Sequence, residues 1–348
     1  MDITKDSQPS SSMKDLSIII PCYNRIALLK ETLKSVEKAI SNVNAEIILV
    51  DDGSLQPIVE QLNDFSRLPI IHLRQRNSGL TTSRHNGLLI SQGKYIQFLD
   101  SDDLIDPLKF EKQILAMEKE GADVSHTDYV NIHSSENISD IVNVQHSNNP
   151  AEFFIRIQPC PHSPIYRRDY LLKILNNPSI PLTRDFDYIG EVWMYYNLAP
   201  FKAKIIKINE PLAYYTHHSN DRLSTHWEQM GLSALKLMQL FIKHSPKNQL
   251  YSEESAMYVG QAAFKTFRGL PYNIYKPFQY AFLKVWQRLG STKNLDGGYK
   301  FNLLSKFIGC RNCAIIFKFL AANDYRKIQK IDPSELVEKT NKILSTQI

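Results

Sequence analysis

The fold of this chain is indicated most clearly by residues 95–103, YIQFLDSDD, an apolar run that ends in three carboxylates within four residues. Carboxylates this close repel one another unless a cation lies between them, and hard divalent cations such as Mn²⁺ or Mg²⁺ prefer oxygen ligands. The pattern therefore indicates a buried strand that leads into a metal-binding loop. The alternative is an acidic loop that is simply solvated, or that caps the helix expected near Pro107.

Three further buried strands are predicted upstream, at residues 16–20, 46–50 and 69–73. Between the first two, apolar residues recur at helical spacing over residues 29–40, and Asn24 suits the N-cap of that helix. Strands that alternate with helices are typical of a mostly parallel sheet with helices on both faces. The predicted fold class is therefore α/β.

A polar cluster follows each predicted strand, at the edge where open parallel sheets bind their ligands. These residue types suit a nucleoside diphosphate-sugar: Tyr23 to stack on a base, Asp51 or Asp52 to accept from a base N–H, and Arg84 to face a diphosphate. The acidic loop would hold a metal that bridges the phosphates. Each residue also has a purely structural explanation, as sheet cover, turn residue or surface cation.

Five short motifs stand in order along the first third of the chain: IIPCYN at 19–24, VDDGS at 50–54, NSG at 77–79, SRHNG at 83–87 and FLDSDD at 98–103. Together they resemble the signature of family 2 glycosyltransferases. The resemblance implies the GT-A fold, a Rossmann-like sheet flanked by helices. It also implies a nucleoside-diphosphate-sugar donor, a divalent metal, and transfer with inversion at the anomeric carbon.

Within this resemblance, Pro21, Tyr23 and Asp52 correspond to base and nucleoside contacts, and Asp100 and Asp102 to the Asp-x-Asp motif. The predicted donor site also includes Asn77, Gly79 and Arg84.

For the metal, the resemblance favours Asp102 as the ligand and leaves Asp103 as the alternative. His217 aligns with a histidine that completes the metal site in many relatives, and a neutral imidazole is an ordinary ligand for such metals. His218 is adjacent to it and makes that assignment ambiguous. The expected cofactor is Mn²⁺ or Mg²⁺.

The resemblance is weaker beyond the donor half. The family usually carries Glu-Asp before a Trp-containing helix, and the aspartate is the catalytic base. Alignment here puts Glu191 in the place of that aspartate and Gly190 in the place of the preceding acid. A glutamate can act as a base if it reaches the acceptor hydroxyl. Asp185 and Asp187 are the alternatives, and Glu191 can instead simply support the N-terminus of its helix.

The sequence thus predicts an inverting, metal-dependent glycosyltransferase that moves a sugar from a nucleoside-diphosphate-sugar, with UDP favoured, to a hydroxyl of a glycan or lipid-linked acceptor. Surface polysaccharide or glycoconjugate synthesis is the family-level expectation. One alternative is a non-catalytic nucleotide-sugar-binding or scaffold protein, which the change at Gly190 supports. The other is a haloacid-dehalogenase-type phosphatase with Asp100 as nucleophile. The base, sugar and acceptor have no motif that names them.

The chain of 348 residues is expected to hold a disordered tail (1–14), a GT-A domain (15–228) and a helical C-terminal region (229–348). The donor half of the GT-A domain is 15–128 and the acceptor half is 129–228.

No signal-peptide pattern or spanning stretch is seen, so a cytoplasmic protein is expected, peripheral at most to the inner face of the membrane. The net charge of +5 is small and the basic residues are spread out, which argues against nucleic acid as a partner. In the C-terminal region, helices are expected at residues 232–242, 256–267, 280–289 and 303–320, and bulky apolar residues alternate there with lysine and arginine. This pattern suits either an anionic membrane surface or packing on the same domain or on a second copy in a homo-oligomer.

Overall fold

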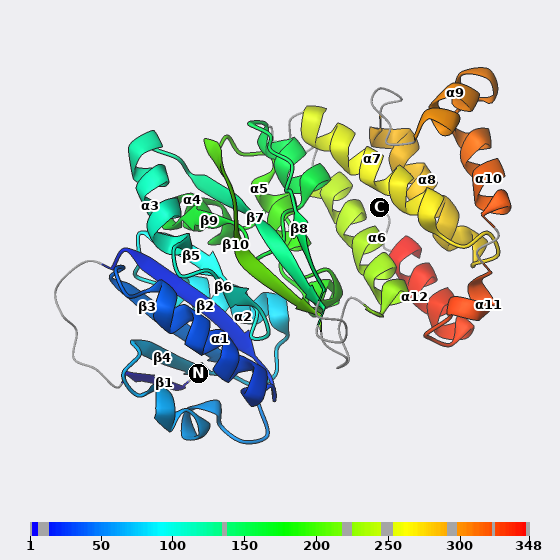
Figure 1. Cartoon of the computed structure of the whole chain (residues 1–348). Helices are drawn as coiled ribbons and strands as arrows, with labels where there is room; N and C mark the ends of the chain where they lie inside the picture. Colours follow the sequence, from blue (N-terminus) through cyan, green and yellow to red (C-terminus); the bar gives the residue numbers. More distant parts are fainter. Residues whose placement is uncertain are drawn as a thin grey trace. The chain divides into compact units, whose positions relative to one another are not determined.

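The computed structural model describes residues 2–5, 14–133, 138–217, 225–244, 253–290, 298–321 and 324–345. The chain forms two compact units, residues 1–220 and 221–348. The first is an α/β unit and the second is helical (Figure 1). The boundary expected after residue 228 lies in the first turn of helix α6, Trp227–His244.

Four parallel strands form the first half of the sheet, in the order β4, β3, β2, β5. Even-numbered side chains of β2 pack in one core with Leu29 and Leu33 of α1. The opposite face is covered by α2, where a Cβ atom added to Gly87 would lie 2.5 Å from Cγ2 of Ile19. The two helices therefore cover opposite faces, as alternation along a strand requires. The bounds are β2 Leu16–Cys22, α1 Ile26–Ala39, β3 Ala45–Asp51, β4 Ile70–Arg74, α2 Leu80–Ile90 and β5 Tyr95–Phe98.

Beyond β5 the sheet is mixed. Strand β9 is antiparallel to both β5 and β7, β7 is parallel to β10, and β10 is antiparallel to β6. Strands β7 and β10 thus run in the same direction as the first four, and β9 and β6 run against them. The expected mostly parallel sheet is confirmed, with β9 as a reversed strand inside it. The bounds are β6 Leu104–Ile105, β7 Val124–His133, β8 Ile138–Val142, β9 Ile165–Arg167 and β10 Ile205–His217.

Short helices complete this unit. They are η1 Ile58–Gln61, η2 Asn63–Phe65, α3 Lys109–Glu120, η3 Glu152–Ile157, α4 Arg168–Leu175, η4 Arg184–Ile189 and α5 Val192–Leu198.

The N-terminal segment differs from the disordered tail expected over residues 1–14. Residues Asp2–Lys5 form strand β1, which pairs antiparallel with β4. The edge of β4 offers backbone N–H and C=O groups, and an extended segment can pair with them whatever its composition. Residues 6–13 lie outside the described part of the chain.

The N-terminus of α1 also differs from the expectation. The N-cap is Arg25 rather than Asn24, and no side chain caps the helix. Asn24 has a left-handed backbone (φ 56°), and its Oδ1 accepts from the backbone N–H of Leu55 at 2.8 Å. The backbone N–H of Asn24 donates to Oγ of Ser54 at 3.0 Å. These bonds join the loops that follow β2 and β3, and both loops lie at the carboxyl edge of the sheet.

The second unit consists of helices in the described residues. The apolar pattern over residues 303–320 forms two helices rather than one, because Gly309 adopts φ +78° between them. No helix in the described part of the chain is both long and apolar enough to cross a membrane. The bounds are α6 Trp227–His244, α7 Glu253–Gly269, α8 Lys276–Leu289, α9 Tyr299–Ile308, α10 Cys310–Leu320, α11 Tyr325–Ile328 and α12 Pro333–Ser345.

Candidate active site

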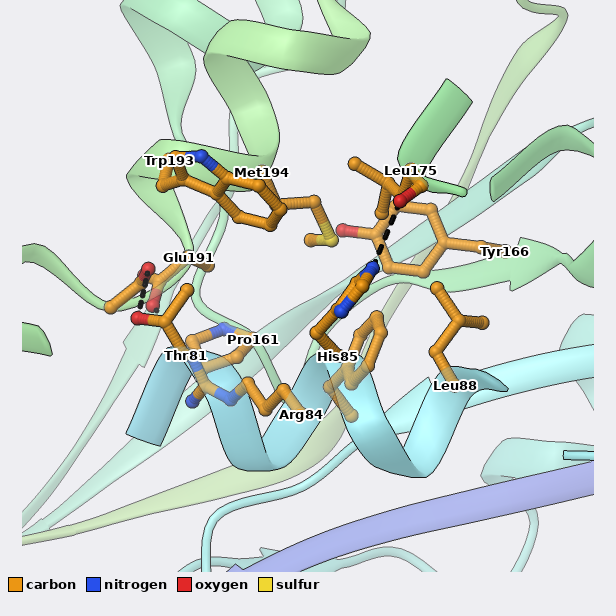
Figure 2. A pocket seen from close by; sticks show the side chains of 12 residues that line it. Thr81, Arg84, His85, Leu88, Pro161, Tyr166, Leu175, Glu191, Trp193 and Met194 are labelled. Atoms are coloured by element: carbon orange, nitrogen blue, oxygen red, sulfur yellow. Dashed lines mark hydrogen bonds and ion pairs between the residues drawn. The ribbon is translucent and has the colours of Figure 1, made fainter. Parts of the chain in front are cut away.

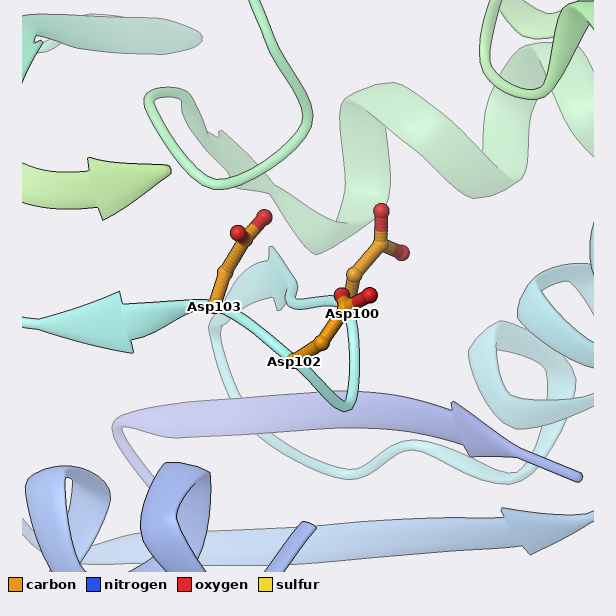
Figure 3. Close-up of side chains that lie close together, drawn as sticks. All are labelled: Asp100, Asp102 and Asp103. Atoms are coloured by element: carbon orange, nitrogen blue, oxygen red, sulfur yellow. The ribbon is translucent and has the colours of Figure 1, made fainter. Parts of the chain in front are cut away.

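The loop after β5 brings together the carboxylates of Asp100, Asp102 and Asp103 (Figure 3). One oxygen of each lies within 4.8 Å of an oxygen of the others. Oxygen donors at this spacing suit a hard divalent cation such as Mn²⁺ or Mg²⁺. The residues present therefore fit the metal that the sequence predicts.

Asp103 is the most enclosed of the three, and both of its oxygens have partners within the protein. Oδ2 lies 2.9 Å from Nδ1 of His162, and Oδ1 accepts from the backbone N–H of Thr216 at 3.0 Å. Burial raises the pKa of Asp103, and the neighbouring His162 acts against that rise. Asp103 thus ties the acidic loop to β10, which favours Asp102 over Asp103 as the residue that faces a metal.

Asp100 and Asp102 each meet an arginine instead. Nη2 of Arg84 lies 2.5 Å from Oδ1 of Asp100, and Nη1 of Arg25 lies 3.0 Å from Oδ2 of Asp102. The side chain of Asp100 is 28% exposed, so this carboxylate borders solvent. The two guanidinium groups offset the repulsion between carboxylates that would otherwise stand side by side.

Arg84 also reaches the segment before α5, where its Nη1 lies 3.4 Å from Oε2 of Glu191. Burial alone would lower the pKa of Arg84, but Asp100 and Glu191 together raise it above its ordinary value. The guanidinium is therefore a buried, permanently charged bridge. It links the loop after β5 to the N-terminus of α5.

Glu191 stands between this bridge and a small apolar cavity (Figure 2). The cavity measures about 20 Å³, which is room for one water molecule and far too little for a sugar. Burial raises the pKa of Glu191, and Arg84 offsets part of that rise. The cavity is lined by Thr81, Arg84, His85, Leu88, Phe98, Pro161, Tyr166, Leu175, Gly190, Glu191, Trp193 and Met194.

The two alternative carboxylates are placed differently. Oδ1 of Asp187 accepts from the backbone N–H of Thr81 at 3.2 Å, in the first turn of α2. Asp187 also packs so closely on Gly79 that an added Cβ atom would lie 1.9 Å from its Oδ2. Asp185 is exposed, and Oγ1 of Thr183 donates to it at 3.2 Å. Of the three acids, Glu191 is the one paired with Arg84.

Asp52 organises the loop that leads into α2. Its carboxylate accepts from Nε2 of Gln75 at 2.7 Å, from the backbone N–H of Ser78 at 2.8 Å and from that of Gly79 at 2.9 Å. Gly79 has φ +94°, a conformation that glycine adopts without strain. Oδ1 of Asn77 accepts from Arg184 at 2.9 Å. The structure thus brings Asp52, Asn77 and Gly79 together.

Asp51 stabilises the turn that directly follows β3. Its carboxylate accepts from the backbone N–H of Ser54 at 2.8 Å and pairs with Arg74 at 2.7 Å. Of the two aspartates, Asp52 is the one whose carboxylate faces the Asn77–Gly79 loop. Pro21 is buried near the end of β2, and Tyr23, two residues further along, is 47% exposed. An exposed aromatic ring at this edge is placed where a planar group could stack on it.

His217 lies at the end of β10, outside the group of three aspartates. Its ring centroid is 4.9 Å from that of Tyr215, at nearly right angles. The connection to the acidic loop runs through the preceding residue, because Thr216 donates to Asp103. His218 lies outside the described residues.

Two residues at the site had no place in the sequence-based prediction. Arg25 directly follows the IIPCYN motif, so its position was a usable signal for a cation near the acidic loop. His162 is 59 residues from Asp103, and no local pattern connects the two.

Comparison with known proteins identifies the family. The profile described as Glycosyl transferase family 2 matches residues 17–174. An uncharacterized glycosyltransferase of Haemophilus influenzae is 30% identical over 226 residues, which are 59% of this chain and 69% of that protein. One from Rickettsia bellii is 38% identical over 120 residues. That match covers 34% of this chain, which spans only 17% of the length of the Rickettsia protein.

Among solved structures, the fold resembles that of S. aureus TarS, residues 1–349, crystallised with UDP-GlcNAc. The TM-score is 0.60 at 18% sequence identity, over 91% of this chain and 93% of that one. The predicted GT-A fold with a helical C-terminal region is confirmed. The phosphatase alternative is wrong, because the matching family profile and the relatives are those of glycosyltransferases. This chain belongs to glycosyltransferase family 2.

Proposed function

We propose that the protein transfers a sugar from a UDP-sugar to a hydroxyl group of a glycan or lipid-linked acceptor, with inversion at the anomeric carbon and with a divalent metal. The observation that carries the proposal is the Arg84 bridge, which joins the acidic loop at Asp100 to Glu191. A direct displacement needs a group that faces the leaving diphosphate and a base for the nucleophile within one site. Arg84 holds those two regions together.

The donor side is supported by the carboxyl edge of the sheet. Tyr23 is exposed there and suits stacking on a uracil ring, while Asp52 fixes the loop at Asn77–Gly79 against which a nucleoside can lie. TarS, whose fold is similar, has been crystallised with UDP-GlcNAc and with UDP. UDP is therefore the first nucleotide to test.

For the metal, the proposal assigns Asp102, with Asp100 beside it and His217 as a further candidate. Asp103 is assigned a positioning role because both of its oxygens have protein partners. When bound, the metal supplies stabilisation of negative charge on the leaving diphosphate. Arg84 adds a fixed positive charge at the same edge.

Glu191 is the proposed base. Its carboxylate takes the proton of the acceptor hydroxyl, the oxygen bonds to the anomeric carbon, and the bond from that carbon to the diphosphate oxygen breaks. The electron pair leaves with the nucleoside diphosphate. Because burial raises the pKa of Glu191, this carboxylate is a stronger base than an exposed glutamate. No covalent intermediate is needed.

The test is UDP release by the purified full chain from UDP-GlcNAc, UDP-glucose and UDP-galactose, each with Mn²⁺ or with EDTA. Metal-dependent release, raised by an added glycan acceptor, is the expected result. A metal-dependent rise in melting temperature with no release would instead favour the non-catalytic binding protein, since binding alone stabilises the native state. Neither a shift nor release with any UDP-sugar would contradict the proposed donor.

A further inference from the structure

Helices α9 and α10 of the second unit have an unusual distribution of side chains. The inner side of the pair is closed by Phe301, whose ring lies 5.9 Å from that of Phe317 and 6.2 Å from that of Phe264 in α7. The remaining buried residues of α10 are Cys313, Ala314 and Lys318. Apart from Phe317, which packs on Phe301, the inner side of α10 is formed by two small residues and one lysine.

Lys318 is the charged residue of α10 that points into the protein. Its Nζ donates to Oε1 of Gln279 at 2.6 Å and lies 4.2 Å from the ring centroid of Phe267. A lysine turned inward in this way has its charge satisfied by the protein. The exposed side of α10 is therefore formed by the apolar residues on either side of Lys318 in the sequence.

The outer sides of both helices carry large apolar residues. In α9 they recur every fourth position, and in α10 they occur as two adjacent pairs four residues apart, so each set lies on one face of its helix. Phe307 is 79% exposed and Phe319 is 70% exposed. We call the set the exposed apolar stripes: Tyr299, Leu303 and Phe307 in α9, and Ile315, Ile316, Phe319 and Leu320 in α10.

The charged residues of these two helices have a single sign. Residues 298–321 contain no aspartate or glutamate. Lys300, Lys306 and Arg311 are exposed, while Lys318 is the inward-facing cation. An apolar face whose own helices carry cations and no carboxylates matches a lipid surface, which has an apolar interior and negatively charged headgroups.

We propose that the exposed apolar stripes dock on an anionic lipid bilayer, with the aromatic and aliphatic side chains at the boundary between headgroups and acyl chains. Lys300, Lys306 and Arg311 would then lie at the level of the phosphates. Helices of 10 and 11 residues are too short to span, so the contact is peripheral. This proposal does not depend on the proposed sugar transfer.

A second copy of the chain is the competing occupant, and the charges argue against it. A symmetric contact uses the same patch on both subunits, so it would place the cations of one copy near those of the other. The helix pair holds no carboxylate to compensate. A bilayer that contains anionic lipid removes this repulsion.

The experiment is cosedimentation of the full chain with vesicles of phosphatidylcholine, with or without phosphatidylglycerol. Binding is expected to be stronger by roughly tenfold or more with the anionic lipid, and to weaken with salt. The double variant Phe307→Ser, Phe319→Ser is expected to lose most of this binding. Leu115→Ser, at a 62% exposed leucine of α3, is the matched control and should bind as the parent does.

A charge variant separates the electrostatic contribution to vesicle binding from the contribution of the apolar side chains. Lys306→Glu with Arg311→Glu should abolish the preference for anionic vesicles, whereas Lys38→Glu with Lys119→Glu, at exposed lysines of α1 and α3, should retain it. Since all these side chains are exposed, melting temperatures should stay within a few degrees and show that folding is intact.

Three results would overturn the proposal. The first is a parent protein that does not sediment with anionic vesicles, and the second is binding that survives both the serine and the glutamate variants. The third is a dimer, seen by light scattering, that the serine variant dissociates while vesicle binding is unchanged. That last result would assign the stripes to a second copy of the chain.

Discussion

The acidic loop after β5 and the segment before α5 both present carboxylates to the same edge of the sheet, but they are held differently. In the loop, Asp103 is buried and both of its oxygens have partners. Before α5, Glu191 has one ion pair, with Arg84 at 3.4 Å, and borders a small cavity. The first arrangement fixes the position of the Asp103 carboxylate. The second allows the Glu191 carboxylate to exchange Arg84 for another partner. This contrast suits a rigid charged loop opposite an adaptable base.

The largest effect is expected at Glu191. Replacement by glutamine keeps the size of the side chain but removes the proton acceptor, so turnover should fall by roughly 10²–10⁴-fold. The shift in melting temperature with UDP-sugar should remain. Asp185→Asn is the matched control, because Asp185 is an exposed acid in the preceding helix. Near-full turnover of the glutamine variant would remove Glu191 from the role of base.

Asp102→Asn is expected to have the next largest effect. The amide is a weaker metal ligand and cannot pair with Arg25, so the Mn²⁺ concentration for half-maximal activity should rise roughly tenfold or more. Arg25→Gln is the control for the lost ion pair. If the asparagine variant responded to Mn²⁺ as the parent does and Asp103→Asn did not, the assignment of the two aspartates would have to be exchanged.

Arg84→Met probes the bridge between the two regions. Arg84 opposes the rise in the pKa of Glu191, so its removal should raise that pKa further. A base must be ionised to act, and the acidic limb of the pH–rate profile should therefore move to higher pH. A shift of about one unit would correspond to about 1.4 kcal/mol. A lower rate at an unchanged pH profile would show that Arg84 supports the fold or the donor without acting on Glu191.

The sequence predicted the parts of the fold that rest on local pattern. Apolar runs located β2, β3 and β5, and the order of strands and helices indicated the α/β class. The structure differs from the predicted helices at two places. Gly309 divides the apolar stretch over residues 303–320 into two helices, and Asn24 joins two loops instead of capping α1. At both positions the backbone has a positive φ, which neither the interior nor the N-cap of a helix normally adopts.

The candidate site could be predicted residue by residue but not as an arrangement. Sequence placed Asp100, Arg84 and Glu191 separately, yet the ion pairs among them join positions that are 16 and 107 residues apart. The partner of Asp103 could not be predicted from the sequence, since no motif surrounds His162. Tertiary packing decides such contacts. Their assigned roles remain predictions for the experiments above.

The smallest effect on catalysis, and the clearest on stability, is expected at Asp103. Replacement by asparagine keeps the shape but weakens the contacts with His162 and with the backbone N–H of Thr216, which should cost about 2 kcal/mol. Urea unfolding measures this loss, and Asp185→Asn is the comparison because its carboxylate is exposed. If Asp103 only positions the loop, the residual activity should keep the Mn²⁺ dependence of the parent. Normal stability together with lost Mn²⁺ dependence would instead make Asp103 a ligand, and the contrast between the rigid and the adaptable carboxylate would fail.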